Sequence, residues 1–317
     1  MAGICKTAVA LMTLGLTGLA GCVTPPPENT PSPPTIRPAP PQPEVKPRSQ
    51  ASLEMAAFYK QRQAYFLVND LLRVDGGGPD TPFLQRNLVD NFIRITMFHE
   101  YETKDGKLIA RPTKTRLNKW QGPIRMQVQF GETVPLEQRS KDRASIRKYT
   151  KRLSRLTGLP ITLTNQSPNF HVFIVDEDQR RALGPQLKQV APQITTVMLN
   201  LATQMDREQF CMVATFSDSD SSPVTSKAVA VIRGEHPDLL RLTCIHEELA
   251  QGLGLANDSP TARPSIFNDD EEFALLTHHD ELLLQMLYDD RLRPGMTVDE
   301  VRPIAEQIAA ELMGGSS

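Results

Sequence analysis

The chain has little net charge and few cysteines, and the apolar run at its N-terminus is too short to span a bilayer. The 35 basic and 37 acidic side chains leave a formal net charge of −2, which argues against a general nucleic-acid binder. The sequence has no phosphate-binding loop, dinucleotide fingerprint or nucleophile elbow. It therefore gives no support to the common nucleotide-binding enzymes or serine hydrolases.

The first 22 residues have the features of a lipoprotein signal. Lys6 precedes an apolar segment over residues 8–19, and Leu19-Ala20-Gly21-Cys22 matches a lipobox, in which cleavage exposes Cys22 for acylation. We expect a signal peptide over residues 1–21 and a lipid-anchored protein of the cell envelope; a short uncleaved anchor is the alternative. Val23, in place of aspartate, is similar to enterobacterial signals for the outer membrane, which favours an anchor there that faces the periplasm.

Residues 22–48 are rich in proline and contain no aromatic side chain. Such a segment cannot bury a core, and it populates extended polyproline II. We expect a disordered tether, which at about 3.1 Å per residue reaches up to roughly 80 Å from the lipid anchor. A proline-rich ligand for a partner domain is the alternative.

Cys211 and Cys244 are the two cysteines that remain beyond the lipobox. An even pair in an oxidising periplasm predicts a disulfide, which here joins the segment before a Ser/Asp-rich loop to the helix described below. Two free, buried cysteines are the alternative, because spacing alone does not decide between them.

Two parts of the folded region differ in pattern. Residues 49–115 are expected to form a helical N-terminal extension, because apolar residues recur with helical spacing from Ser52 to Arg73. A Gly-rich break follows, and the segment Phe83–Phe98 is expected to begin as a helix and end as a strand. Residues 116–317 should form one larger domain. Its expected elements are strands at 124–130, 161–164, 171–175, 212–216 and 228–232, with a helix at 142–156 after the first.

Residues 247–258 read E-E-L-A-Q-G-L-G-L-A-N-D. They resemble the zinc-binding helix of metzincin proteases, H-E-x-x-H-x-x-G-x-x-H, with every ligand changed. The resemblance puts Glu247, Gln251 and Asn257 at the ligand places, Glu248 at the place of the catalytic base and Gly254 at the turn. Zinc is not expected there, because it prefers imidazole or thiolate to amide oxygens. We therefore expect these ligand places to be empty.

Two later segments follow in the order that a metzincin has. Ser265-Ile266-Phe267 resembles the turn that forms the floor under the metal, with Phe267 in place of methionine. Residues 277–288, which include Asp280 and Tyr288, resemble the closing matrixin helix, L-[ST]-x-x-D-x-x-x-x-Q-x-L-Y. The resemblance implies an α+β, metzincin-like (zincin-type) domain with a mixed sheet and a helix like that of the active site. Strand, helix, strand, strand ahead of that helix is the metzincin order too.

His246 precedes the motif, and a second register starts there. His246-Glu247 would begin H-E-x-x-H, but the second histidine would then fall on Ala250. That register fails, and a satisfied, partly buried histidine is the interpretation that we favour.

Acidic residues surround the motif. Asp258, Asp269, Asp270, Glu271 and Glu272 join Glu247 and Glu248. Carboxylate and amide oxygens suit calcium or magnesium better than zinc, although the spacing is not that of an EF-hand. A metal-free acid/base pair that uses Glu248 and a neighbouring carboxylate is another interpretation.

Residues 51–310, and residues 244–296 above all, also resemble a family of proteobacterial lipoproteins that carry a domain of unknown function. This resemblance implies location and architecture but no chemistry. We expect a non-catalytic envelope module, a pseudopeptidase, that binds a peptide or protein and needs no cofactor. The alternatives are an atypical metal-dependent peptidase or hydrolase with Glu248 as base, and a structural outer-membrane lipoprotein that contacts the cell wall.

Overall fold

The computed structural model describes residues 45–104, 107–219 and 221–314, and its description of side chains leaves out residues 99–112. The predicted signal peptide, Cys22 and most of the predicted tether lie outside the described residues. None of the helices in the described part is both long and apolar enough to cross a membrane.

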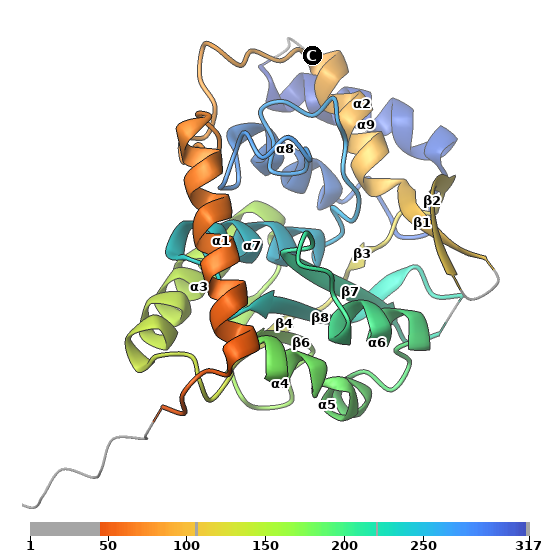
Figure 1. Cartoon of the computed structure of the whole chain (residues 1–317). Helices are drawn as coiled ribbons and strands as arrows, with labels where there is room; N and C mark the ends of the chain where they lie inside the picture. The colour runs from red at the N-terminus through yellow and green to blue at the C-terminus, as the bar shows by residue number, and fades with distance from the viewer. Residues whose placement is uncertain (1–44, 105–106, 220, 315–317) are drawn as a thin grey trace, which may run out of the picture. The chain divides into compact units, whose positions relative to one another are not determined.

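A six-stranded sheet carries the fold (Figure 1). Its strands are β3 (Lys119–Trp120), β4 (Ile124–Phe130), β5 (Ile161–Leu163), β6 (Phe170–Val175), β7 (Cys211–Ser217) and β8 (Val224–Arg233). The order is β3–β8–β6–β4–β5 with parallel pairing, and β7 pairs with β8 in the antiparallel direction. The five strands predicted between residues 124 and 232 are confirmed to within four residues at each end, and β3 is an addition.

Both faces of the sheet are covered, which explains why all six residues of β6 are buried. Successive side chains of a strand point to opposite faces. Val172 and Ile174 therefore belong to one core with the helices α3 (Leu136–Thr157) and α7 (Asp238–Gln251). Phe173 and Val175 belong to a second core with α5 (Gly184–Val190) and α6 (Thr196–Thr203). The long apolar run of β6 thus marks the centre of the sheet.

The helix predicted at 142–156 is confirmed as part of the longer α3. It begins six residues earlier, directly after Pro135, and it ends at Gly158, whose φ of 70° lies in the left-handed region. The three helices between β6 and β7 were not predicted. They are α4 (Glu177–Arg181), α5 and α6. They are short, and their apolar residues lack a clear period.

The N-terminal extension contains α1 (Gln50–Val68), α2 (Gln85–Thr96) and a hairpin of β1 (Phe98–Lys104) with β2 (Lys107–Lys114). The change from helix to strand near Phe98 is therefore confirmed. The predicted continuation of the first helix to Arg73 is wrong. The backbone amides of Leu72 and Arg73 bond to the carbonyls of Glu271 and Glu272 instead, so this stretch joins the C-terminal part of the chain.

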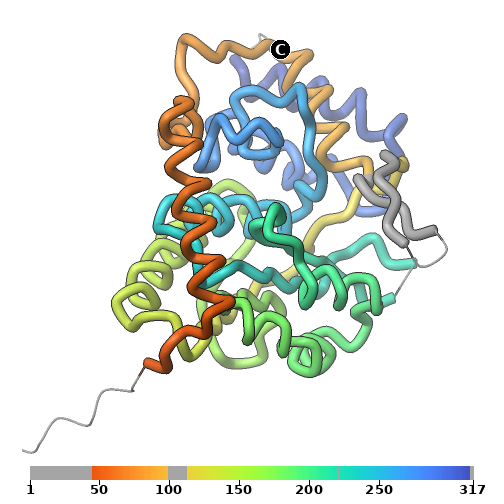
Figure 2. The backbone as a smooth tube through the Cα atoms, in the orientation of Figure 1, coloured from red at the N-terminus to blue at the C-terminus, as the bar shows by residue number. Residues whose placement is uncertain are grey.

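The C-terminal part consists of α7, α8 (His278–Leu287), α9 (Val298–Leu312) and long connecting loops. N-terminal and C-terminal segments are interleaved, because α2 packs beside α9 and contacts α8 (Figures 1 and 2). Nine helices and a mostly parallel sheet thus make up a mixed fold of helices and strands in the described residues. At this level the predicted fold class is confirmed.

The predicted disulfide is confirmed. Cys211, the first residue of β7, is bonded to Cys244 of α7, and their Cα atoms are 5.9 Å apart. Cys244 is buried and Cys211 is partly exposed. The bond therefore ties the antiparallel strand to the helix that carries the metzincin-like motif.

We expect buried neutral histidines to make the fold sensitive to acid. Burial lowers the pKa of His236 from 6.5 to about 3, while its Nε2 donates to the carbonyl of Phe210. Below pH 6.5 the unfolded chain binds a proton that the folded chain does not bind. Stability present above pH 6.5 is therefore lost as the pH falls towards 3, by about 1.4 kcal/mol per pH unit for each such group.

The His236→Gln variant keeps a donor for Phe210 and removes this titration. Denaturant unfolding at a series of pH values between 6.5 and 3.5 should give a slope of unfolding free energy against pH that is smaller by about 1.4 kcal/mol per unit. An unchanged slope would contradict the assignment of a neutral His236.

Candidate functional site

The last turns of α7 carry two consecutive glutamates, which we call the acid pair: Glu247 and Glu248. Glu248 is 3% exposed, whereas Glu247 is partly exposed. One carboxylate oxygen from each lies within 4.8 Å of the other and of the Cys211 sulfur. Because this sulfur is in the disulfide, it is not a thiolate, and the acid pair is the ionisable part of the group.

The electrostatics of the acid pair favour bound protons or a bound cation. Burial raises the pKa of Glu248 well above its usual value, and Asp258 raises it further. Burial also raises the pKa of Glu247, and the negative charges of Glu248 and Asp258 raise it further. A carboxylate pair with like charges around it does not fully ionise unless a positive charge arrives. The surroundings therefore favour the protonated form of the pair over its fully ionised form when no cation is bound.

Glu271 extends this acidic region from the loop that follows the motif. Burial raises its pKa to about 7, Arg62 opposes the rise, and Asp269 and Asp270 add to it. Glu272 differs from these residues because it pairs with Arg263 and Arg73, which hold its pKa below the usual value. The acidic constellation of the sequence thus divides into a region near the acid pair and a conventional ion-paired surface.

Two buried oxygens in the motif have no hydrogen-bond partner within the described part of the chain. They are Oε2 of Glu248 and Oδ1 of Asn257, and Asn257 is 5% exposed. A buried polar atom left without a partner costs about 1–3 kcal/mol, so such atoms are uncommon unless something else satisfies them. Both belong to positions that the motif assigns, the base and the third ligand.

The amide nitrogens of the motif make contacts with the protein itself. Nε2 of Gln251 donates to Asp258 Oδ1 at 3.4 Å, and Nδ2 of Asn257 donates to the carbonyl of Arg94 in α2 at 3.1 Å. The structure thus joins Glu247 with Glu248 and ties Gln251 to Asp258. The proximity of Cys211 to the acid pair has no sequence signal, since it depends on how β7 packs against α7.

Gly254 forms the turn after α7. Its φ is 115°, and a Cβ atom there would lie 2.8 Å from the carbonyl oxygen of Asn118. A side chain is therefore excluded both by the backbone conformation and by the close approach of Asn118. This geometry gives the physical reason for glycine at the position that the motif assigns to the turn.

Asp280 organises the turn at Ser265–Phe267. This fully buried carboxylate accepts hydrogen bonds from Ser265 Oγ at 2.5 Å and from the amide of Ile266 at 3.1 Å. It also accepts from the amide and the hydroxyl of Thr277 at 2.9 and 2.8 Å. The turn and the start of α8 therefore share one anchor, and Phe267 is fully buried in the main core.

Tyr288 supports the C-terminal end of α7. Its hydroxyl donates to the carbonyl of Leu253 at 2.7 Å and accepts from the amide of Trp120. The indole of Trp120 donates to the carbonyl of Gly252 at 2.8 Å. Carbonyls at the end of a helix lack hydrogen-bond partners within the helix. These two bonds provide partners for the carbonyls of Leu253 and Gly252.

His246 is a satisfied core residue. Its Nδ1 accepts from the amide of Leu276 at 3.1 Å, and its ring stacks on Tyr149 with a centroid distance of 3.9 Å. Burial lowers its pKa to about 3, so it is neutral near pH 7. This geometry agrees with the interpretation of a partly buried histidine.

A cavity of about 700 Å³ adjoins the motif, and we call it the α2 pocket. Apolar walls come from α2, β1 and α9, while charged residues of both signs stand around them. The lining includes Ile93, Arg94, Phe98, Lys114, Asn257, Asp258, Asp269 and Val298. The pocket shares Asp258 and Asp269 with the acidic residues that surround the motif.

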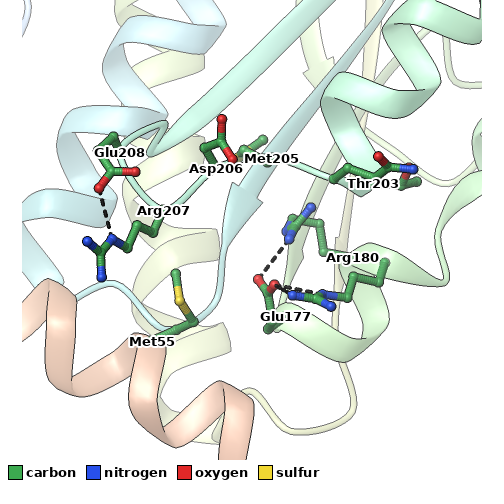
Figure 3. Close-up of a pocket in the computed structure, with 10 residues that line it drawn as sticks. Met55, Glu177, Arg180, Thr203, Met205, Asp206, Arg207 and Glu208 are labelled. Atoms are coloured by element: carbon green, nitrogen blue, oxygen red, sulfur yellow. Dashed lines mark hydrogen bonds and ion pairs between the residues drawn. The ribbon is translucent and has the colours of Figure 1, made fainter.

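A second cavity, of about 780 Å³, lies between α1, α4 and the loop before β7 (Figure 3). Most of its charged side chains are paired with one another. Glu177 bonds to Arg180 and Arg181, and Arg207 pairs with Glu208 (Figure 3). Glu177 also accepts from Arg233. The buried Arg233 also donates to the carbonyls of Met205 and Asp206, so this network fixes the approach to β7.

Comparison with known proteins gave one result. The family model described as "Protein of unknown function (DUF2927)" matches residues 85–307, from the start of α2 into α9. No curated protein and no solved structure matches the chain.

We expect Asp280→Ala to lower the free energy of unfolding by about 3 kcal/mol or more, since each buried donor left without its acceptor costs about 1–3 kcal/mol. Asp280→Asn keeps one acceptor oxygen and should cost less. Denaturant unfolding of both variants measures the two losses, and equal stability of Asp280→Ala and the unchanged protein would contradict the anchoring role.

Proposed function

This chain belongs to the DUF2927 family of proteins of unknown function, and we propose that it is a lipid-anchored module of the cell envelope that binds an extended peptide segment without cleaving it. The binding surface is the free edge of β7 beside α7, with the α2 pocket as a recess for a side chain. The observation that carries the proposal is that the antiparallel β7 pairs on one side only among the described strands.

Support for a metzincin-like architecture comes from the order of the elements. The parallel strands β4, β5, β6 and β8 precede α7, and the antiparallel β7 lies next to β8. The turn at Gly254 follows α7, and the turn anchored by Asp280 follows that. These features occur in the sequence order that the motif led us to expect, which favours a metzincin-like domain.

Binding without cleavage is favoured by the side chains at the ligand places. A working metal-dependent hydrolase needs three good ligands and an open position for water. Here Gln251 and Asn257 offer weak amide oxygens, and their nitrogens already donate to Asp258 and to the Arg94 carbonyl. The alternative is a hydrolase with Glu248 as base. One specific observation favours it, namely that Oε2 of Glu248 has no hydrogen-bond partner among the described residues.

Peptide binding is favoured by the exposed edge. An edge strand presents unpaired amide and carbonyl groups, and an extended peptide satisfies them by adding a strand. The disulfide at Cys211 holds the start of β7 against α7, so a peptide on this edge runs close to the acid pair. The α2 pocket, which shares Asp258 with the acidic region, then accepts a side chain of the bound peptide.

The proposed location rests on the sequence. The lipobox at Cys22 and the Pro-rich tether support an anchor in the outer membrane with the folded domain in the periplasm. The disulfide is consistent with an oxidising compartment.

Hydrogen exchange of the full-length chain in detergent, with and without a pool of synthetic extended peptides, tests the proposal. We expect the amides of β7, residues 211–217, to become protected when the peptides bind. β5, residues 161–163, forms the opposite edge of the sheet and serves as the internal control. Absence of protection at β7, or equal protection at β5, would sink the proposal of strand addition.

A further inference from the structure

Among the described residues, no positive side chain pairs with the acid pair. The charges that act on it most strongly are carboxylates, with Asp258 acting on both members and Asp269 and Glu271 acting on Glu247. Buried charges in proteins are ordinarily paired or coordinate a metal. The pair therefore needs a positive charge from outside the described chain or a proton.

Two buried oxygen atoms of the motif provide a further observation, independent of charge. Glu248 is only 3% exposed. Its Oε2 atom lacks a hydrogen-bond partner within the described residues. One carboxylate oxygen of Glu248 lies within 4.8 Å of one of Glu247, so the carboxylate that carries the unpartnered oxygen lies beside the other member of the pair. Oδ1 of Asn257, on the turn after α7, is the second buried oxygen in the same state.

We propose that Glu247 and Glu248 form a binding site for a hard divalent cation, Ca²⁺ or Mg²⁺. This inference goes beyond peptide binding and does not depend on it. The site differs from the ligand places of the motif, because it uses two consecutive residues rather than Glu247, Gln251 and Asn257 together.

The kinds of donor atom select the cation. Carboxylate and amide oxygens bind Ca²⁺ and Mg²⁺, whereas zinc prefers imidazole and thiolate. The neighbouring sulfur of Cys211 is held in the disulfide, so the site has no thiolate. Two carboxylates with water in the other positions are a usual set for Mg²⁺, and further oxygens are needed for Ca²⁺.

The burial of Glu248 favours a small ion over the ammonium group of a peptide. A lysine side chain or a peptide terminus has to bring its carbon atoms with it, and Glu248 leaves only 3% of its surface accessible. A cation brings no covalently attached carbon chain with it. Bound there, it neutralises the acid pair and lies beside the bond that fixes the start of β7.

Isothermal titration calorimetry on the full-length chain, freed of metal with chelator and kept in detergent, tests the site. We expect CaCl₂ or MgCl₂ to bind with a stoichiometry of one ion per chain, and separate titrations with each salt distinguish the two ions. Glu248→Gln should weaken binding at least about tenfold, since it removes one charged ligand. No binding by the unchanged chain, or equal binding by Glu248→Gln, would overturn the proposal.

Glu306→Gln is the matched control. It makes the same chemical change at an exposed position of α9, and it should bind the cation as the unchanged chain does. Glu248→Gln itself removes a buried charge, so thermal unfolding in chelator should give it a midpoint at least as high as that of the unchanged chain. Glu247→Gln is the second variant, with the same expected loss of binding.

Terbium provides a readout of location. The chain has a single tryptophan, Trp120, whose indole bonds to Gly252, one turn beyond Glu248. Tb³⁺ in the proposed site should therefore emit when tryptophan is excited, and the bound Ca²⁺ or Mg²⁺ should displace it. Emission that persists in both Glu247→Gln and Glu248→Gln would show that the ion binds elsewhere and would overturn the assignment.

Discussion

The burial of α7 between the sheet and the C-terminal helices is the constraint on which the rest of the structure depends. Its apolar side chains join those of β6 and β8 in the main core. Cys244 bonds it to β7, and Tyr288 and Trp120 supply partners for the carbonyls that follow it. Contacts at its middle and at its C-terminal end thus fix the helix, and Glu248 lies inside the protein. Glu248 is therefore buried and Glu247 partly buried, although burial opposes their ionisation.

That arrangement connects the two proposals. A like-charged pair costs stability in the folded state unless a proton or a cation accompanies it. A stable core can retain a locally unfavourable feature, and such features cluster at functional sites. The acid pair lies beside Cys211, at the start of the strand whose outer edge we propose as the peptide-binding surface. A cation there would act on the same segment that positions the peptide.

Much of the fold could be predicted because its elements leave local patterns. The alternation at Ile124–Phe130, the apolar run around Val172 and the glycine after α3 gave strands and helix ends close to those observed. The end of α1 could not be predicted, since Leu72 and Arg73 bond to residues about 200 positions later in the chain. The short helices α4 to α6 were missed because tertiary packing on the second face of the sheet stabilises them.

The sequence by itself determined which residue types are present near the site: the carboxylates and amides at the positions that the metzincin resemblance assigns to ligands, the glycine at position 254, and the two cysteines that are available to pair. These follow from residue type and short-range spacing. Only the tertiary structure decided that the disulfide lies against the acid pair, that Asp280 holds the Ser265 turn, and that α2 closes a pocket beside Asn257. The reason is physical, because burial, pKa and hydrogen-bond partners are properties of contacts between distant segments, which residue spacing does not encode.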